Sequence, residues 1–146
     1  MSWRVLVIFE NEKVYHDALS YAKELALRMD SEVTLLMLVE MPFYGGSFLG
    51  TKRAAILKIK KRTAKVLSEC MSMFLEAGIA VSTAIRIGNP AQELIKFLSE
   101  KAPFQVVIWG SGKALPGRGQ ALRNHWLKRI AVDMECPLLT VSGEEI

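Results

Sequence analysis

Short apolar runs alternate with longer amphipathic segments along the chain, and this alternation restricts the fold more than any other feature. Residues 5–9 (VLVIF) and 33–39 (VTLLMLV) are continuous apolar runs. Such runs are typical of strands that are covered on both faces of a sheet. Residues 79–87, 105–109 and 138–142 are predicted as three further strands. The first of these three alternates in polarity, so we expect it to be less buried than the others.

Four helices are predicted between the strands, because apolar residues recur there at three- and four-residue spacing. The first follows Asn11, a residue type that caps helices well. The second is long and ends before Gly78, since glycine is common just past a helix end. The third begins at Asn89-Pro90, with asparagine as the cap and proline at the first helical position. The fourth covers residues 121–134.

Strands and helices that alternate in this way imply right-handed crossovers and a parallel sheet with helices on both faces. The predicted fold class is therefore α/β, a three-layer sandwich of five strands and four helices, with residues 1–146 as a single domain. Hydrophobic residues make up 51% and charged residues 23% of the chain, the balance of a soluble globular protein. The apolar runs are too short for a transmembrane segment. The N-terminus lacks the features of a signal peptide, so we expect a cytoplasmic location.

Ligands of open parallel sheets bind beyond the carboxyl ends of the strands. The predicted strands end near Glu10, Val39, Gly88 and Gly110. The segment after the fourth strand, residues 109–126 (WGSGKALPGRGQALRNHW), is the richest in glycine and basic residues. Glycine amides followed by a helix N-terminus favour a phosphate or another anion.

Two named phosphate motifs do not match this segment. A P-loop requires serine or threonine after Gly112-Lys113, where the chain has Ala114. The dinucleotide fingerprint requires glycine at Leu115 and a place in the first strand–helix unit. The segment is therefore a candidate anion site without a recognised nucleotide motif.

Neither a metal site nor a catalytic site is predicted. The two cysteines, Cys70 and Cys136, and the two histidines, His16 and His125, do not cluster in the sequence, whereas zinc requires about four ligands. His125 has no nucleophile motif and no obvious carboxylate to orient it. We therefore expect that the protein is not an enzyme.

The second predicted helix, which follows the connection 41–53, carries an acid-free basic segment, 52–65. Such a segment is typical of a solvated helix face, a nucleic-acid site or a membrane-surface site. An apolar stripe on the other side of the helix favours the solvated face. No aromatic residues interleave the bases, so a nucleic-acid partner is not expected. The bases are Lys52, Arg53, Lys58, Lys60, Lys61, Arg62 and Lys65.

Five motifs in the right order resemble the universal stress protein family over nearly the whole chain. They are RVLVIF with an acid after it, the strand 33–40, the turn GNP at 88–90, VVIWGSG, and CPLLTV at 136–141. The resemblance implies a Rossmann-like fold of the adenine nucleotide alpha hydrolase type, with strand order 3-2-1-4-5. It also implies a homodimer joined through the last strand, Leu138–Ser142.

Members of this family that bind ATP carry aspartate after the first strand and G-x2-G-x9-G-[ST] after the fourth. Here Glu10 replaces the aspartate, and Gly110 matches the first glycine. Lys113 stands at the second glycine, with Gly112 one place early, and the loop is one residue longer than the motif. The closing Gly-Ser pair is Asn124-His125.

We therefore expect weak ATP binding or none, in a dimeric stress-response protein. The alternative is that a basic variant of the loop holds ATP or another anionic ligand, because charged contacts can replace lost amide contacts. The bases available for this are Lys113, Arg118 and His125. The full set of candidate binding residues is Glu10, Val39, Gly110, Gly112, Lys113, Arg118, Asn124 and His125.

Overall fold

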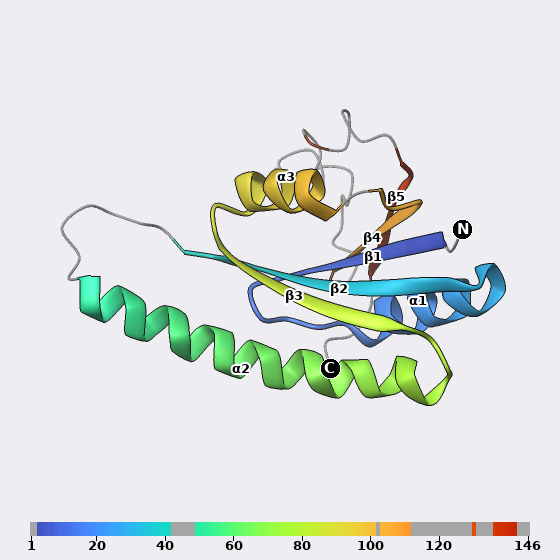
Figure 1. Ribbon diagram of the computed structural model, residues 1–146, viewed down its shortest axis with the longest axis horizontal. Helices are drawn as coiled ribbons and strands as arrows, with labels where there is room; N and C mark the ends of the chain where they lie inside the picture. Colours follow the sequence, from blue (N-terminus) through green and yellow to red (C-terminus); the bar gives the residue numbers. More distant parts are fainter. Residues whose placement is uncertain (1–2, 42–48, 102, 112–129, 131–135, 143–146) are drawn as a thin grey trace.

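A five-stranded parallel sheet forms the centre of the protein (Figure 1). The computed structural model describes residues 3–41, 49–101, 103–111, 130 and 136–142. The strand order is β3-β2-β1-β4-β5, as the family resemblance implies. The strands are β1 (Trp3–Glu10), β2 (Ser31–Glu40), β3 (Val81–Gly88), β4 (Val106–Ser111) and β5 (Leu138–Ser142).

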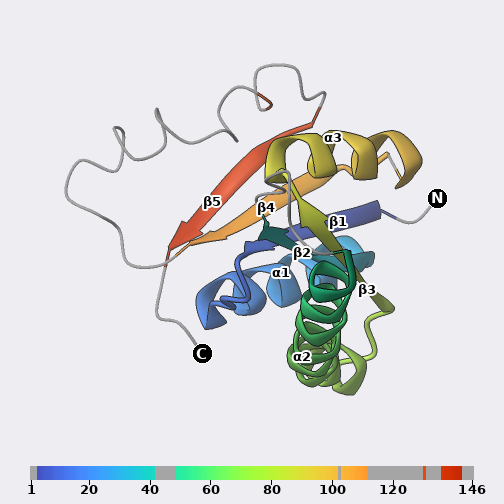
Figure 2. The ribbon, with the colours of Figure 1, turned by 90° about the vertical axis from the view of Figure 1, so that its left-hand side faces the viewer.

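Helices cover both faces of this sheet, which confirms the predicted three-layer α/β architecture. In Figures 1 and 2, α1 (His16–Met29) and α2 (Leu49–Glu76) lie on one face, and α3 (Pro90–Lys101) lies on the other. These are the three helices of the described part of the chain. The predicted fourth helix, 121–134, lies outside the described residues except for Ile130, which is helical and buried.

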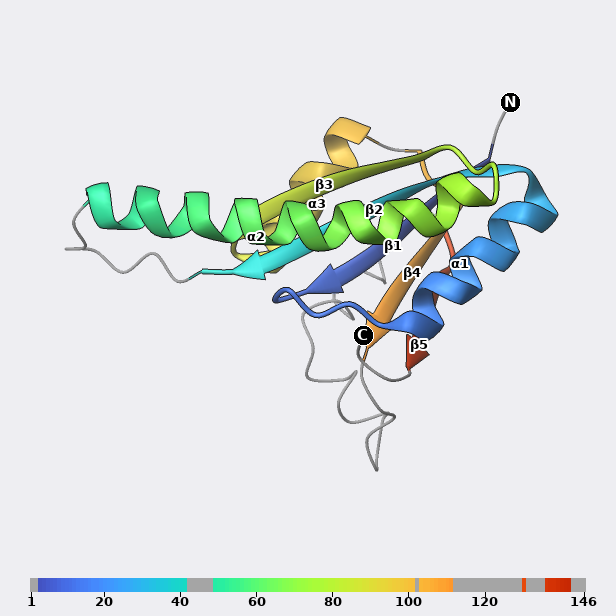
Figure 3. The same ribbon diagram turned by 90° about the horizontal axis from the view of Figure 1, so that it is seen from below.

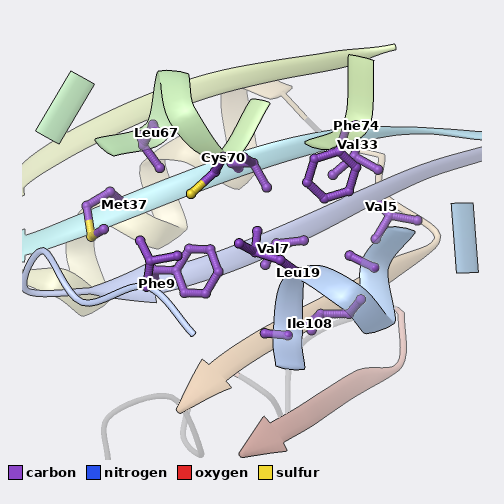
Figure 4. Packing of buried hydrophobic residues seen from close by; sticks show 14 of the residues in the cluster. Val5, Val7, Phe9, Leu19, Val33, Met37, Leu67, Cys70, Phe74 and Ile108 are labelled. Atoms are coloured by element: carbon purple, nitrogen blue, oxygen red, sulfur yellow. The ribbon is translucent and has the colours of Figure 1, made fainter. Parts of the chain in front are cut away.

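Each face of the sheet has its own hydrophobic core, because neighbouring residues of a strand point to opposite faces. Val5, Val7 and Phe9 of β1 pack with α1 and α2 (Figure 4). Leu6 and Ile8 pack with α3 on the other side. The prediction that the first two strands are covered on both faces is confirmed, since residues 5–9 and 33–39 are all buried. β3 is more exposed, as expected for an edge strand.

The first helix begins later than the sequence predicts, and Asn11 is not its cap. Asn11 and Glu12 have positive φ angles of 52° and 63°, so the backbone cannot continue into a helix there. The helix starts at His16 after Tyr15, which makes no side-chain capping bond. Tyr21 of this helix is 43% exposed, so it lies outside the buried stripe of Ala18, Leu19, Ala22 and Ala26.

The other helix ends agree more closely with their local signals. The Oδ1 atom of Asn89 accepts a hydrogen bond from the amide of Gln92 (3.0 Å), which confirms the cap of α3. Gly78 follows α2 with a φ of 77°. At its other end, α2 begins at Leu49, inside the predicted connection 41–53. It is therefore longer than predicted, and its first turns extend past the end of β2 (Figure 3).

Candidate functional site

The predicted site residues of the first and fourth strands lie at the same edge of the sheet. β1 and β4 are adjacent and parallel, with Ile8 opposite Trp109. Glu10 and Gly110 therefore both lie at the carboxyl edge, where a ligand of this fold class is expected. Glu10 is half-buried, whereas Gly110 is buried.

Gly110 is held in place by packing. A methyl group at this position would lie 2.5 Å from Cε1 of Phe9 and 3.0 Å from Cβ of Ala18. Both of these neighbours are fully buried, so they have little room to move. The glycine that matches the first position of the ATP motif is therefore required by the core alone.

Val39 is located at the end of β2, as predicted, but its side chain belongs to the core. It is 6% exposed and packs in the cluster formed with α1 and α2. The next residue, Glu40, is exposed at the end of the strand. The side chain of Val39 thus has little surface to offer a ligand.

The loop after β1 uses its backbone amides within the protein. The amide of Asn11 donates to the carbonyl of Leu38 (2.8 Å), and that of Lys13 donates to the carbonyl of Glu10 (3.1 Å). Between them, the amide of Glu12 points to the Sδ atom of Met37 (3.2 Å). Three successive amides at the carboxyl edge are therefore occupied.

The side chain of Asn11 completes this arrangement. Its Oδ1 atom accepts a hydrogen bond from the amide of Glu40 (2.9 Å), which ties the ends of β1 and β2 together. Asparagine adopts positive φ angles more readily than most residues. The side-chain bond and the tolerated backbone conformation explain why asparagine fits this position.

An ion pair that the sequence did not reveal links this loop to α2. Nε and Nη2 of Arg62 donate to the two carboxylate oxygens of Glu12, at 2.6 and 2.7 Å. Oγ1 of Thr63, which is fully buried, donates to the same carboxylate (3.3 Å). The hydrogen bonds from Arg62 hold the pKa of Glu12 below its ordinary value, and the carboxylate in turn raises the pKa of Arg62. Fifty residues separate the partners, so no local pattern indicates the pair.

Two open cavities flank α1. One, of about 360 Å³, lies between the start of α1 and α2. Cys70 lines it, and burial together with the nearby Glu69 raises the pKa of this thiol. The other, of about 400 Å³, lies between α1 and β5. Neither cavity is lined by the candidate binding residues that the structure describes.

The remaining candidate residues of the loop lie outside the described part of the chain. They are Gly112, Lys113, Arg118, Asn124 and His125. Within the described residues, no group of three or more His, Cys, Asp or Glu side chains could hold a metal ion. None of the helices in this part of the chain is both long and apolar enough to span a membrane.

Comparisons with known proteins agree with this fold. A curated universal stress protein of Methanocaldococcus jannaschii is 24% identical over 139 residues, which cover 94% of this chain and 81% of that protein. The solved universal stress protein UspA of Lactobacillus plantarum has a TM-score of 0.72 at 16% identity, covering 95% of this chain and 97% of that one.

A universal stress family protein of Arabidopsis thaliana with AMP bound has a TM-score of 0.60 at 16% identity. The match covers 97% of this chain and 92% of the Arabidopsis chain. The model of the universal stress protein family matches residues 1–142. The chain therefore belongs to the universal stress protein family.

Proposed function

We propose that this universal stress protein is a homodimeric stress-response protein that holds ATP weakly or not at all and catalyses no reaction. The observation that carries the proposal is the closed loop after β1. The amides of Asn11, Glu12 and Lys13 are all engaged within the protein, so they are not free to contact a nucleotide. A ligand that bound these three amides would have to displace native hydrogen bonds, and their loss lowers affinity.

The sequence of the phosphate loop supports the same proposal. Gly110 is explained by its packing against Phe9, so its presence does not require a nucleotide. Lys113 places a side chain where the family motif has its second glycine, and the closing Gly-Ser pair is absent. Backbone that must approach phosphate closely favours glycine.

The test is titration of the purified full chain with ATP and magnesium in a calorimeter. We expect a Kd weaker than about 1 mM for the wild type. A variant that restores the motif, K113G/N124G/H125S, should bind at least about tenfold more tightly, because it recovers the glycines and the small hydroxyl. The charge-matched control K96Q should bind as the wild type does. A micromolar Kd for the wild-type chain would contradict the proposal.

A second candidate function is adenine-nucleotide binding through the basic loop. The AMP-bound relative from Arabidopsis thaliana favours it, as does the acid kept at Glu10. In that case Lys113 and Arg118 contact the phosphates, and K113A/R118A weakens binding by a hundredfold or so. The effect of removing Lys113 distinguishes the two candidate functions. In the variant K113G/N124G/H125S, ATP binding becomes tighter under the first candidate function and weaker under the second.

The proposed dimer uses the outer edge of β5. In the strand order of the described residues, β5 pairs with β4 and lies at the edge of the sheet. An edge strand presents unpaired backbone groups that a second strand can meet. We expect the chain to sediment as a dimer at micromolar concentration, and T140P to weaken it because proline disrupts strand pairing. A wild-type chain that sediments as a monomer would refute this part.

A further inference from the structure

Five basic residues of α2 form an exposed face, which we call the basic face. No Asp or Glu occurs between Leu49 and Ser68, so the positive charge of this stretch is not balanced along the helix. All five side chains are exposed. The basic face consists of Arg53, Lys58, Lys60, Lys61 and Lys65.

The basic face is separate from the surface that anchors α2. Thr63, Leu67 and Phe74 are fully buried and hold the helix against the sheet. Arg62, another base of the segment 52–65, faces the loop after β1 and binds Glu12. The ion pair thus neutralises the charge of this base, although its side chain stays 62% exposed.

The position of the helix presents this face to the outside. The first turns of α2 run past the end of β2, so they stand clear of the sheet (Figure 3). α3, the helix on the other layer, lies across the sheet from them (Figure 1). Of the described helices, α3 therefore does not cover the basic face.

An apolar side chain lies among the bases. Leu57 is 61% exposed and is adjacent in sequence to Lys58. Ala54, one helical turn before Leu57, and Ala64, two turns after it, are also exposed. Lysines that surround an exposed leucine match the two components of a lipid interface, the charged headgroups and the acyl chains.

We propose that the basic face docks α2 on an anionic phospholipid membrane surface. Leu57 favours lipid over nucleic acid, because an exposed apolar side chain among the bases matches acyl chains beside charged headgroups. The segment 52–65 contains no aromatic residue on which the bases of a single strand could stack. Since none of the described helices could cross a bilayer, contact is at the surface.

The strength of the contact follows from the number of charges. Each lysine or arginine near an anionic membrane contributes about fivefold to the partition coefficient. Neutralising three of the five bases should therefore weaken binding by roughly a hundredfold. Because the attraction is screened by salt, raising the ionic strength should release the protein.

The experiment is co-sedimentation of the full chain with lipid vesicles at about 0.1 M salt. One set of vesicles contains phosphatidylcholine with about 30% phosphatidylserine, and the other contains phosphatidylcholine alone. The test variant is K58Q/K61Q/K65Q. The matched control is K13Q/K96Q/K101Q, which removes the same charge from exposed sites outside the basic face. Thermal unfolding of each variant checks that the fold is kept.

We expect the wild type and the control to sediment with the phosphatidylserine vesicles and not with phosphatidylcholine alone. The test variant should remain in solution. Absence of wild-type sedimentation, or equal loss in the test variant and the control, overturns the proposal. Duplex DNA is added as a competitor, and binding to DNA without binding to vesicles also overturns it. None of these outcomes depends on whether ATP binds.

Discussion

Replacing Gly110 by alanine tests whether the packing of the core accounts for this glycine. The new methyl group would lie 2.5 Å from Cε1 and 2.8 Å from Cδ1 of Phe9. Carbon atoms in good contact are about 3.5–4.0 Å apart, so the shortfall is roughly 1 Å. Phe9 and Ala18 are fully buried, and neither can move into solvent. The shift must therefore be taken up by the core.

Overpacking of this kind costs about 1–3 kcal/mol, and we expect the upper end because two buried neighbours are involved. A loss of about 3 kcal/mol lowers Tm by on the order of 10 °C in a chain of this size. The measurement is urea unfolding followed by circular dichroism, together with a thermal scan.

A second substitution separates steric conflict from other causes. Phe9→Leu shortens the side chain that the methyl group meets, so Gly110→Ala should cost about 1 kcal/mol or less in that background. The two changes are then non-additive by about 2 kcal/mol. If Gly110→Ala leaves the wild type unchanged, or costs the same with leucine at position 9, the packing explanation for this glycine is refuted.

Three further predictions concern single contacts. Asn89→Ala should lower the free energy of unfolding by about 1 kcal/mol, because the amide of Gln92 loses its acceptor; unchanged urea unfolding would show that the cap is dispensable. Gly78→Ala should lower the free energy of unfolding by about 1–2 kcal/mol, because the φ of 77° at this position disfavours a side chain. No described atom lies within 4 Å of the added methyl group, so Phe9→Leu should not relieve this cost. Glu12→Gln should destabilise the protein slightly at neutral pH, because the pKa of Glu12 is lowered in the folded state. The stabilisation by the charged Glu12 carboxylate is present above the unfolded pKa near 4.5 and is lost as the pH falls through the folded pKa. The Tm values of the wild type and the variant should therefore converge in acid. A difference in Tm that persists there would contradict the role given to this ion pair.

Features set by neighbouring residues were predicted well. The buried strands β1 and β2, the cap at Asn89 and the stop at Gly78 all depend on patterns a few residues long. The meeting of Glu10 and Gly110 at one edge follows from the parallel sheet. The order of the strands came from the family resemblance, since local patterns do not order strands.

Features set by distant partners were missed. Asn11 was predicted to cap α1, but its side chain instead binds Glu40, twenty-nine residues away. The pair between Glu12 and Arg62 spans fifty residues and leaves no local signal. The early start of α2 at Leu49 was hidden by Gly50, whose helix penalty of about 1 kcal/mol is small within a helix of 28 residues.

The length of α2 has a consequence for local unfolding. A helix of 28 residues is about 42 Å long, whereas β3, on which it packs, spans 8 residues or about 26 Å. The turns near Leu49 lie beyond this support, whereas Leu67 and Phe74 are buried. Amide hydrogens in the first turns should therefore exchange with solvent through local fraying, and those near Phe74 only when the sheet itself opens. A single helix would then belong to two cooperative units of the same molecule.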